Sequence, residues 1–84
     1  LDIAQILSTA VQQAKDLQDP RTQSYALGVL GNLYEQTQQR SDAQNLTQQA
    51  LFIAQTIDAR DIAYRWEWQL GRLLKARGYL TGAI

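Results

Sequence analysis

One stretch near the C-terminal end of the sequence combines basic and aromatic side chains at a helical spacing. The residues that recur every three or four positions, and that a helix would bring onto one face, are Arg65, Trp68, Arg72, Lys75 and Tyr79. The planar guanidinium of arginine matches a carboxylate, and tryptophan supplies rigid apolar contact area. This pattern predicts a face that binds an acidic peptide. The alternative is a solvated helix face on which Asp61 pairs with Arg65.

The chain lacks the side chains on which most catalytic and metal sites depend. It has no histidine and no cysteine, which excludes thiol nucleophiles, imidazole acid–base chemistry and the usual ligands of transition metals. Asp58 and Asp61 are three residues apart, but both are expected at a helix start, where capping is the simpler role. Gly28 and Gly31 lie within a predicted helix and follow no strand, so they do not form a phosphate-binding loop. We therefore expect no catalytic residue, no metal and no cofactor.

Charge is balanced over the whole chain but not along it. The eight basic and eight acidic residues cancel. Residues 1–59 carry three basic and six acidic side chains, a net charge of −3, whereas residues 60–84 carry five basic and two acidic ones, a net charge of +3. A net charge of zero with one basic helix favours a protein or peptide partner over nucleic acid.

No segment of the sequence is apolar enough to cross a membrane. The longest uninterrupted apolar run covers residues 50–54, whereas a spanning helix needs about 20 apolar residues. The first residues lack the basic region of a signal peptide, and the absence of cysteine does not suggest a secreted disulfide scaffold. We expect a cytoplasmic protein that does not bind membranes.

The composition predicts an all-α fold with four helices. Glutamine, alanine and leucine dominate, and β-branched residues never alternate with a period of two for long. The expected helices cover residues 2–18, 21–37, 42–57 and 61–77. Connections of only a few residues make neighbouring helices antiparallel.

Local signals mark where these helices begin and end. Asp19 followed by Pro20 ends one helix and begins the next, with proline at the first helical position. Ser41 has Gln44 three residues later, which is the spacing of a capping box. Further expected signals are a helix cap at Asp58 or Asp61, a C-terminal cap at Gly78 and the cap of a following helix at Thr81.

The sequence repeats weakly after about 40 residues, a period found in helical repeat proteins. Leu30 matches Leu70 and Gly31 matches Gly71, and other pairs conserve only the size of an apolar side chain. A repeat of this length built from helix pairs is typical of an α-solenoid, in which each repeat buries its apolar face against the next. For the last helix, a register shorter by one position, which pairs Trp66 with Leu27, is an alternative that the sequence leaves open.

The repeated positions carry a family resemblance. The tetratricopeptide motif, with its leucine, glycine and tyrosine in one helix and two alanines in the next, is matched by Leu27, Leu30, Gly31, Tyr34, Ala43 and Ala50. The chain resembles the branch of the tetratricopeptide repeat (TPR) family with a 40-residue period. Residues 24–28, residues 61–66 and the glutamine-rich stretch of residues 44–50 are also similar to TPR segments of cyanobacterial proteins that end in a caspase-like CHAT domain. No catalytic residue of such a domain is present.

The resemblance implies antiparallel helix-turn-helix repeats stacked as a short TPR-like α-solenoid over residues 1–84. Residues 1–19 would be helix B of a preceding repeat and residues 20–58 one complete repeat. Residues 59–84 would be helix A and the start of helix B of the next repeat.

The resemblance further implies a concave groove lined by the two A helices. Its lining would be Tyr25, Gly28, Asn32 and Glu35 in one repeat and Arg65, Trp68, Arg72 and Lys75 in the next. The expected peptide-binding residues are Tyr25, Asn32, Arg65, Trp68, Arg72 and Lys75. The implied function is a non-catalytic protein–protein interaction scaffold that binds a peptide segment, of acidic character, along this groove. The alternative is a structural spacer within a larger multidomain protein that binds no ligand itself.

The packing pattern adds four expectations. Gly31 and Gly71 should allow close approach of a neighbouring helix, and Phe52 either packs on a further neighbour or lies exposed. The buried stripe of the last helix should comprise Ile62 or Ala63, Trp66, Leu70, Leu73 and Leu74. Because the terminal helices of an array normally carry polar caps, uncapped ones here could cause self-association.

Overall fold

Four α-helices follow one another in the computed structural model, which describes residues 2–81 and, for residues 79–81, the backbone alone. They are α1 (Ile3–Asp16), α2 (Pro20–Gln36), α3 (Arg40–Thr56) and α4 (Arg60–Thr81). Residues 2–81 contain no strand, which confirms the predicted all-α class. Within the same residues, no helix combines the length and the apolar character that crossing a membrane requires.

The three connections between the helices are built alike. Each has three residues, and the middle one adopts the left-handed conformation, with φ of 56° at Gln18, 64° at Gln38 and 57° at Asp58. The N–H of the third residue donates to the carbonyl oxygen five residues earlier at 2.8 Å in every case. This hydrogen bond ends one helix tightly and lets the next begin at once.

These identical connections fix the register of the repeat. The helices that follow them begin at Pro20, Arg40 and Arg60, so successive helix starts are equally spaced. The start of α4 therefore matches the start of α2 in the register that pairs Leu30 with Leu70, and not in the register shorter by one position. Trp66 consequently occupies the position of Ala26 in α2 and not that of Leu27.

Asp19 acts as predicted, whereas the expected signal before α3 does not. The Asp19 carboxylate accepts a hydrogen bond from the Thr22 N–H at 3.2 Å, and Pro20 follows at the start of α2. In contrast, α3 begins before Ser41, and its N-terminal cap, Gln39, makes no side-chain cap hydrogen bond. The tight connection around Gln38 starts the helix early, which leaves Ser41 inside its first turn.

The signals around α4 also differ from expectation. Asp58 is the left-handed residue of its connection, and Asp61 already lies in the first turn of α4, so neither is the residue before the helix. Gly78 does not end α4, which continues to Thr81. Glycine inside a helix costs only about 1 kcal/mol relative to alanine, and the leucine- and alanine-rich residues before it favour continuation. Thr81 is itself helical in α4, and the helix expected after it lies outside the described residues.

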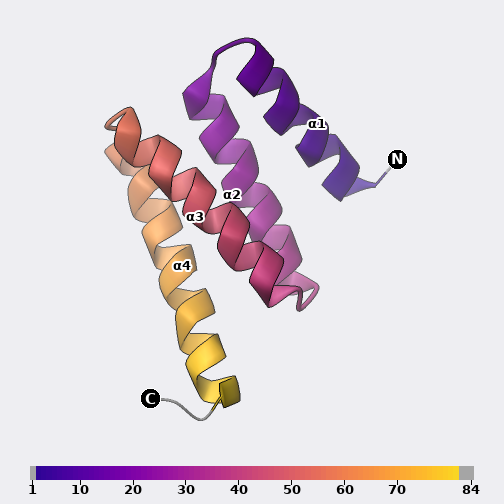
Figure 1. Ribbon diagram of the computed structural model, residues 1–84, viewed down its shortest axis with the longest axis vertical. Coiled ribbons are helices and arrows are strands. Elements are labelled where there is room, and N and C mark those ends of the chain that lie inside the picture. Colours follow the sequence, from indigo (N-terminus) through magenta and orange to yellow (C-terminus); the bar gives the residue numbers. More distant parts are fainter. Residues whose placement is uncertain (1, 82–84) are drawn as a thin grey trace.

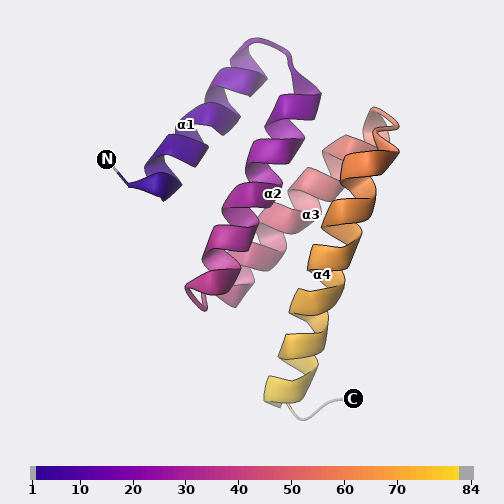
Figure 2. The same cartoon turned by 180° about the vertical axis from the view of Figure 1, so that it is seen from behind.

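The helices form a thin array with α2 and α3 at its centre. α1 packs against α2, and α4 packs against both α3 and α2. Figure 1 shows α1 and α4 on opposite sides of the central pair, and Figure 2 shows α2 and α4 side by side in front of α3. The Cα positions span 43 × 33 × 14 Å. In so thin a molecule, every helix keeps a face in contact with solvent.

Trp66 is the largest side chain of the core. It is 1% exposed. It belongs to a cluster of buried residues from α2, α3, the connection before α4 and α4 itself, namely Leu27, Ala50, Ala54, Ala59, Ile62 and Ala63. Leu73 is buried as predicted and Leu70 is half-buried. The prediction for Leu74 was wrong, because it lies on the side of α4 that neither α2 nor α3 covers and is 48% exposed. Phe52 on α3 is exposed.

Glycines permit two of the close helix contacts. A Cβ atom added at Gly28 would lie 2.2 Å from the Trp66 ring, and one added at Gly31 would lie 2.8 Å from Oγ1 of Thr47. At Gly71 the added atom would meet nothing within 4 Å. The predicted close approach is thus confirmed at Gly31 and wrong at Gly71, which faces away from the other described helices.

The two glycines Gly28 and Gly71 provide a matched test of this packing. Gly28→Ala should destabilise the fold by about 1–3 kcal/mol, because the new methyl group overlaps the indole of Trp66. Gly71→Ala should instead stabilise it by up to about 1 kcal/mol through helix propensity. Urea unfolding of dilute protein measures both changes, and equal effects of the two substitutions would contradict the described contact.

The left-handed residues provide a second test. Gln38→Gly should stabilise the protein by about 0.5–1 kcal/mol, because glycine adopts a positive φ without steric cost. Gln38→Ala is the control and should bring no gain, since alanine keeps the Cβ atom. A lower melting temperature for Gln38→Gly than for Gln38→Ala would contradict the assigned conformation.

Candidate functional site

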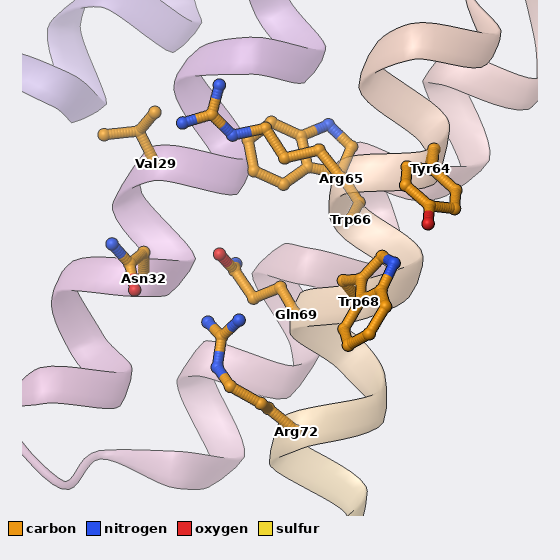
Figure 3. Close-up of a pocket in the computed structure, with 8 residues that line it drawn as sticks. All are labelled: Val29, Asn32, Tyr64, Arg65, Trp66, Trp68, Gln69 and Arg72. Carbon is orange, nitrogen blue, oxygen red and sulfur yellow. The ribbon is translucent and has the colours of Figure 1, made fainter.

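A groove with a volume of about 420 Å³ lies between α2 and α4. Its lining residues are Val29 and Asn32 from α2 and Tyr64, Arg65, Trp66, Trp68, Gln69 and Arg72 from α4. Arg65, Gln69 and Arg72 reach from α4 towards α2, whereas Tyr64 and Trp68 lie on the other side of α4 (Figure 3). The groove thus has polar side chains across it and aromatic ones along one edge, and its lining includes Asn32, Arg65, Trp68 and Arg72 of the expected residues.

The indole of Trp66 joins the groove to the core through a chain of hydrogen bonds. Its Nε1–H donates to Oγ of Ser24 at 3.1 Å, and the Ser24 hydroxyl donates to the carbonyl oxygen of Ala50 at 2.6 Å. Ser24 is fully buried, so its hydroxyl would be costly to leave without a partner. These two hydrogen bonds link α4 to α2 and α2 to α3, and they hold the indole ring in place.

Gln69 makes a second buried link one turn further along α4. Its Nε2 donates to the carbonyl oxygen of Gly28 at 2.9 Å and to Oγ1 of Thr47 at 2.8 Å. The Thr47 hydroxyl in turn donates to the carbonyl oxygen of Ala43 at 2.7 Å. Gln69 therefore fastens α4 to both of its neighbours at the base of the groove.

Sequence reasoning missed these polar core residues. Ser24 lies three positions before Leu27, and Gln69 lies three after Trp66 and four before Leu73. A polar residue at the helical spacing of an apolar stripe was the available signal, since such a residue must find an internal partner.

Arg65 is held over two aromatic rings. Its guanidinium carbon lies 5.4 Å from the ring centroid of Tyr25 and 5.9 Å from that of Trp66. The two rings are tilted by 50° with their centroids 6.0 Å apart. A cation over aromatic faces is attracted by their electron density. No carboxylate among the described residues pairs with Arg65, so its charge is available to a ligand.

The expected ion pair of Asp61 with Arg65 does not form. Asp61 pairs instead with Arg21 of α2, which likewise lies in a first helical turn. The hydrogen bond from Arg21 is the main cause that lowers the pKa of the Asp61 carboxyl below its ordinary value of 3.8. Arg65 turns towards Tyr25, away from Asp61, and the Arg21–Asp61 pair closes one end of the α2–α4 contact.

Arg72 is already bound to a carboxylate of the chain. Its Nε and Nη2 atoms donate to the two carboxylate oxygens of Glu35 at 3.1 and 2.7 Å. This bidentate hydrogen bond raises the pKa of the Arg72 guanidinium. The pair lies at the opposite end of the groove from Arg21 and Asp61, so it braces α2 against α4. Arg72 thus contributes less cationic charge to the groove than its position in the sequence implies.

The remaining predicted residues are only partly brought together. Asn32 lines the groove and has no side-chain hydrogen bond within residues 2–81, and Tyr25 lies beneath Arg65. Trp68 lies along the groove edge, whereas Lys75 lines only an adjoining depression, which shares Tyr64, Trp68 and Arg72 with the groove. Gly28 does not line the groove, because Trp66 covers it. The structure thus groups Tyr25, Asn32, Arg65 and Arg72, with Trp68 beside them and Lys75 apart.

The groove presents the guanidinium of Arg65, which no described carboxylate pairs with, together with amide groups and aromatic surface. Within residues 2–81, no group of three or more histidine, cysteine or acidic side chains is placed to hold a metal ion. Comparison of the chain with protein-family models, with curated proteins and with solved structures finds no match.

The Arg21–Asp61 pair predicts a dependence of stability on pH. Because the pKa of Asp61 is lower in the folded chain, the stabilisation is present above about pH 4 and is lost as the pH falls through the folded-state pKa. The parent should therefore be more stable than Asp61→Asn near neutral pH, and the difference should shrink below about pH 4. Thermal melts from about pH 7 to pH 2 measure it.

Asp42→Asn is the matched control for this pH experiment, since Asp42 also lies in a first helical turn but makes no ion pair within residues 2–81. A difference between the parent and Asp61→Asn that stays constant down to about pH 2 would contradict a role for the pair.

Proposed function

We propose that this chain is a non-catalytic interaction module whose α2–α4 groove binds an extended peptide segment that carries a carboxylate. The observation that carries the proposal is the position of Arg65. Its guanidinium is held over Tyr25 and Trp66 at the groove and has no carboxylate partner within residues 2–81. A charged donor that its own neighbours leave unpaired favours an acidic ligand.

The other side chains of the groove suit the rest of such a ligand. The Asn32 amide can donate to and accept from a peptide backbone, which presents both kinds of group. Trp68 and Tyr64 offer exposed aromatic surface at the edge for an apolar side chain. Arg72 takes part less directly, since Glu35 neutralises it. We expect an acidic residue of the peptide at Arg65 and not at Arg72.

The repeat family belongs to the same proposal. The equal spacing of the helix starts at Pro20, Arg40 and Arg60 and the contact of α2 with both α3 and α4 support a TPR-like array. In this array α2 and α4 are successive A helices. A cytoplasmic location is also part of the proposal, and the absence of cysteine supports it.

A structural spacer that binds no ligand is the second candidate. The two ion pairs between α2 and α4 favour it, because they use Asp61, Arg21, Glu35 and Arg72 to join the helices of the chain to one another. A spacer needs such internal bracing and needs no charge in the groove.

Peptide binding followed by tryptophan fluorescence tests the proposal. Acidic peptides should bind the parent, more weakly at high salt, and Arg65→Ala should weaken binding by roughly 10- to 100-fold, as expected for a charge-assisted hydrogen bond. Arg60→Ala is the matched control, because it removes the same charge from α4 but lies outside the groove and, among the described residues, pairs with Asp58 alone.

The outcomes separate the two candidates. Equal loss in Arg65→Ala and Arg60→Ala would indicate a general effect of charge and would overturn the assigned site. A folded parent that binds none of the acidic peptides would support the spacer.

A further inference from the structure

Two exposed apolar faces lie at opposite ends of the helix array, one on α4 and one on α1. The α4 face is a depression of about 480 Å³ lined by Tyr64, Glu67, Trp68, Gly71, Arg72 and Lys75. Tyr64 and Trp68 are 62% and 61% exposed, and their rings meet edge to face with centroids 6.3 Å apart. The α1 face carries Ile3 and Ile6, which are 63% and 51% exposed. Groups of large apolar side chains in water mark contact surfaces.

The internal repeat indicates what the α4 face is shaped to receive. In the register that the helix starts define, Trp68 and Gly71 occupy the positions of Gly28 and Gly31 in α2. Both α2 glycines are buried, and Gly31 lies directly against Thr47 of α3. Gly28 lies instead against Trp66 of α4. The α4 face therefore corresponds, one repeat earlier, to the side of α2 that receives α3 at Gly31 and α4 at Gly28.

The α1 face has the complementary character. Ile3 and Leu7 occupy the positions of Ala43 and Thr47 in α3. In α3 these positions are fully buried and lie against Gly31 of α2. In α1 they are the exposed Ile3 and the half-buried Leu7. Within residues 2–81, no helix covers the α1 face in the way that α2 covers α3, and no helix covers the α4 face in the way that α3 covers α2.

Charge favours a contact between these two faces over a contact of either with itself. Residues 1–19 carry one basic and three acidic side chains, a net charge of −2, and residues 60–84 carry a net charge of +3. A contact between α4 and α4 would bring like charges together, whereas a contact between α4 and α1 brings opposite ones.

We propose that a second copy of this chain docks with its α1 in the α4 depression, in the way that α3 packs on α2. The contact joins two different faces. A dimer therefore keeps an unoccupied α1 face at one end and an unoccupied α4 face at the other. Association is therefore head to tail and continues beyond the dimer as concentration rises. The depression shares Tyr64, Trp68 and Arg72 with the α2–α4 groove but not Arg65 or Asn32. Because the association does not use Arg65, its failure and the failure of the proposed peptide binding remain distinguishable.

Two variants block one face each and leave the fold of one copy intact. Gly71→Leu fills the depression with a side chain. At the equivalent Gly31, even an added Cβ atom would collide with α3, whereas an added Cβ atom at Gly71 meets nothing within 4 Å in the described chain. Ile6→Arg puts a positive charge on the exposed α1 face, against the positive α4. Gln36→Leu adds a leucine at the exposed end of α2 and is the control for added apolar surface.

Sedimentation velocity over a range of concentrations, with circular dichroism to confirm folding, gives the test. The parent and Gln36→Leu should associate, and each blocking variant alone should associate at least about tenfold more weakly. An equimolar mixture of Gly71→Leu and Ile6→Arg should form a dimer of twice the 9.5 kDa chain mass and nothing larger, because one good face remains on each.

Three results would overturn the proposal. The first is a parent that stays monomeric at about 1 mM, a concentration far above a micromolar dissociation constant. The second is a folded Gly71→Leu variant that associates like the parent. The third is a mixture of the two variants that forms no dimer.

Discussion

The contact of the Trp66 indole with Gly28 is the constraint on which the positions of three helices depend. Because Gly28 has no Cβ, α4 approaches α2 closely enough for the ring to leave solvent almost completely. A buried indole N–H needs an acceptor, and Ser24 on the same helix as Gly28 provides it. The Ser24 hydroxyl then needs an acceptor of its own and finds the Ala50 carbonyl in α3. One missing methyl group therefore sets the spacing of α2, α3 and α4 and the width of the groove.

The rest of the core explains why hydrogen bonds matter so much here. Ala43, Ala50 and Ala54 are fully buried, and alanine lets helices come close but removes little apolar area from water. In a molecule only 14 Å thick, the large ring of Trp66 and the links made by Gln69 supply much of the specific contact between helices. Within residues 2–81 no buried side-chain nitrogen or oxygen lacks a partner, so these links carry no desolvation penalty of an unpaired group.

Local patterns in the sequence predict the elements well and their partners poorly. The all-α class, the start at Pro20 and the close packing at Gly31 follow from spacing and residue size, which act over a few residues. The start of α3 and the end of α4 were mispredicted, because glutamine at a left-handed position gives no signal and a single glycine is tolerated within a helix. Glu35 binds Arg72 across 37 positions, and no local spacing reveals such a pair.

The pairing of Arg72 with Glu35 separates two surfaces of α4 that the sequence presents as one. On the side facing α2, the pair neutralises one end of the groove and leaves Arg65 as the cation without a described carboxylate partner. On the other side, Trp68 has its aromatic neighbour Tyr64 and an open depression. Because the side chains of a single helix cannot all face one groove, the proposed recognition of a charged ligand centres on Arg65 and the proposed packing of an apolar helix centres on Gly71, on different sides of α4. The basic and aromatic spacing in the sequence thus describes two adjoining surfaces of α4 with different chemistry.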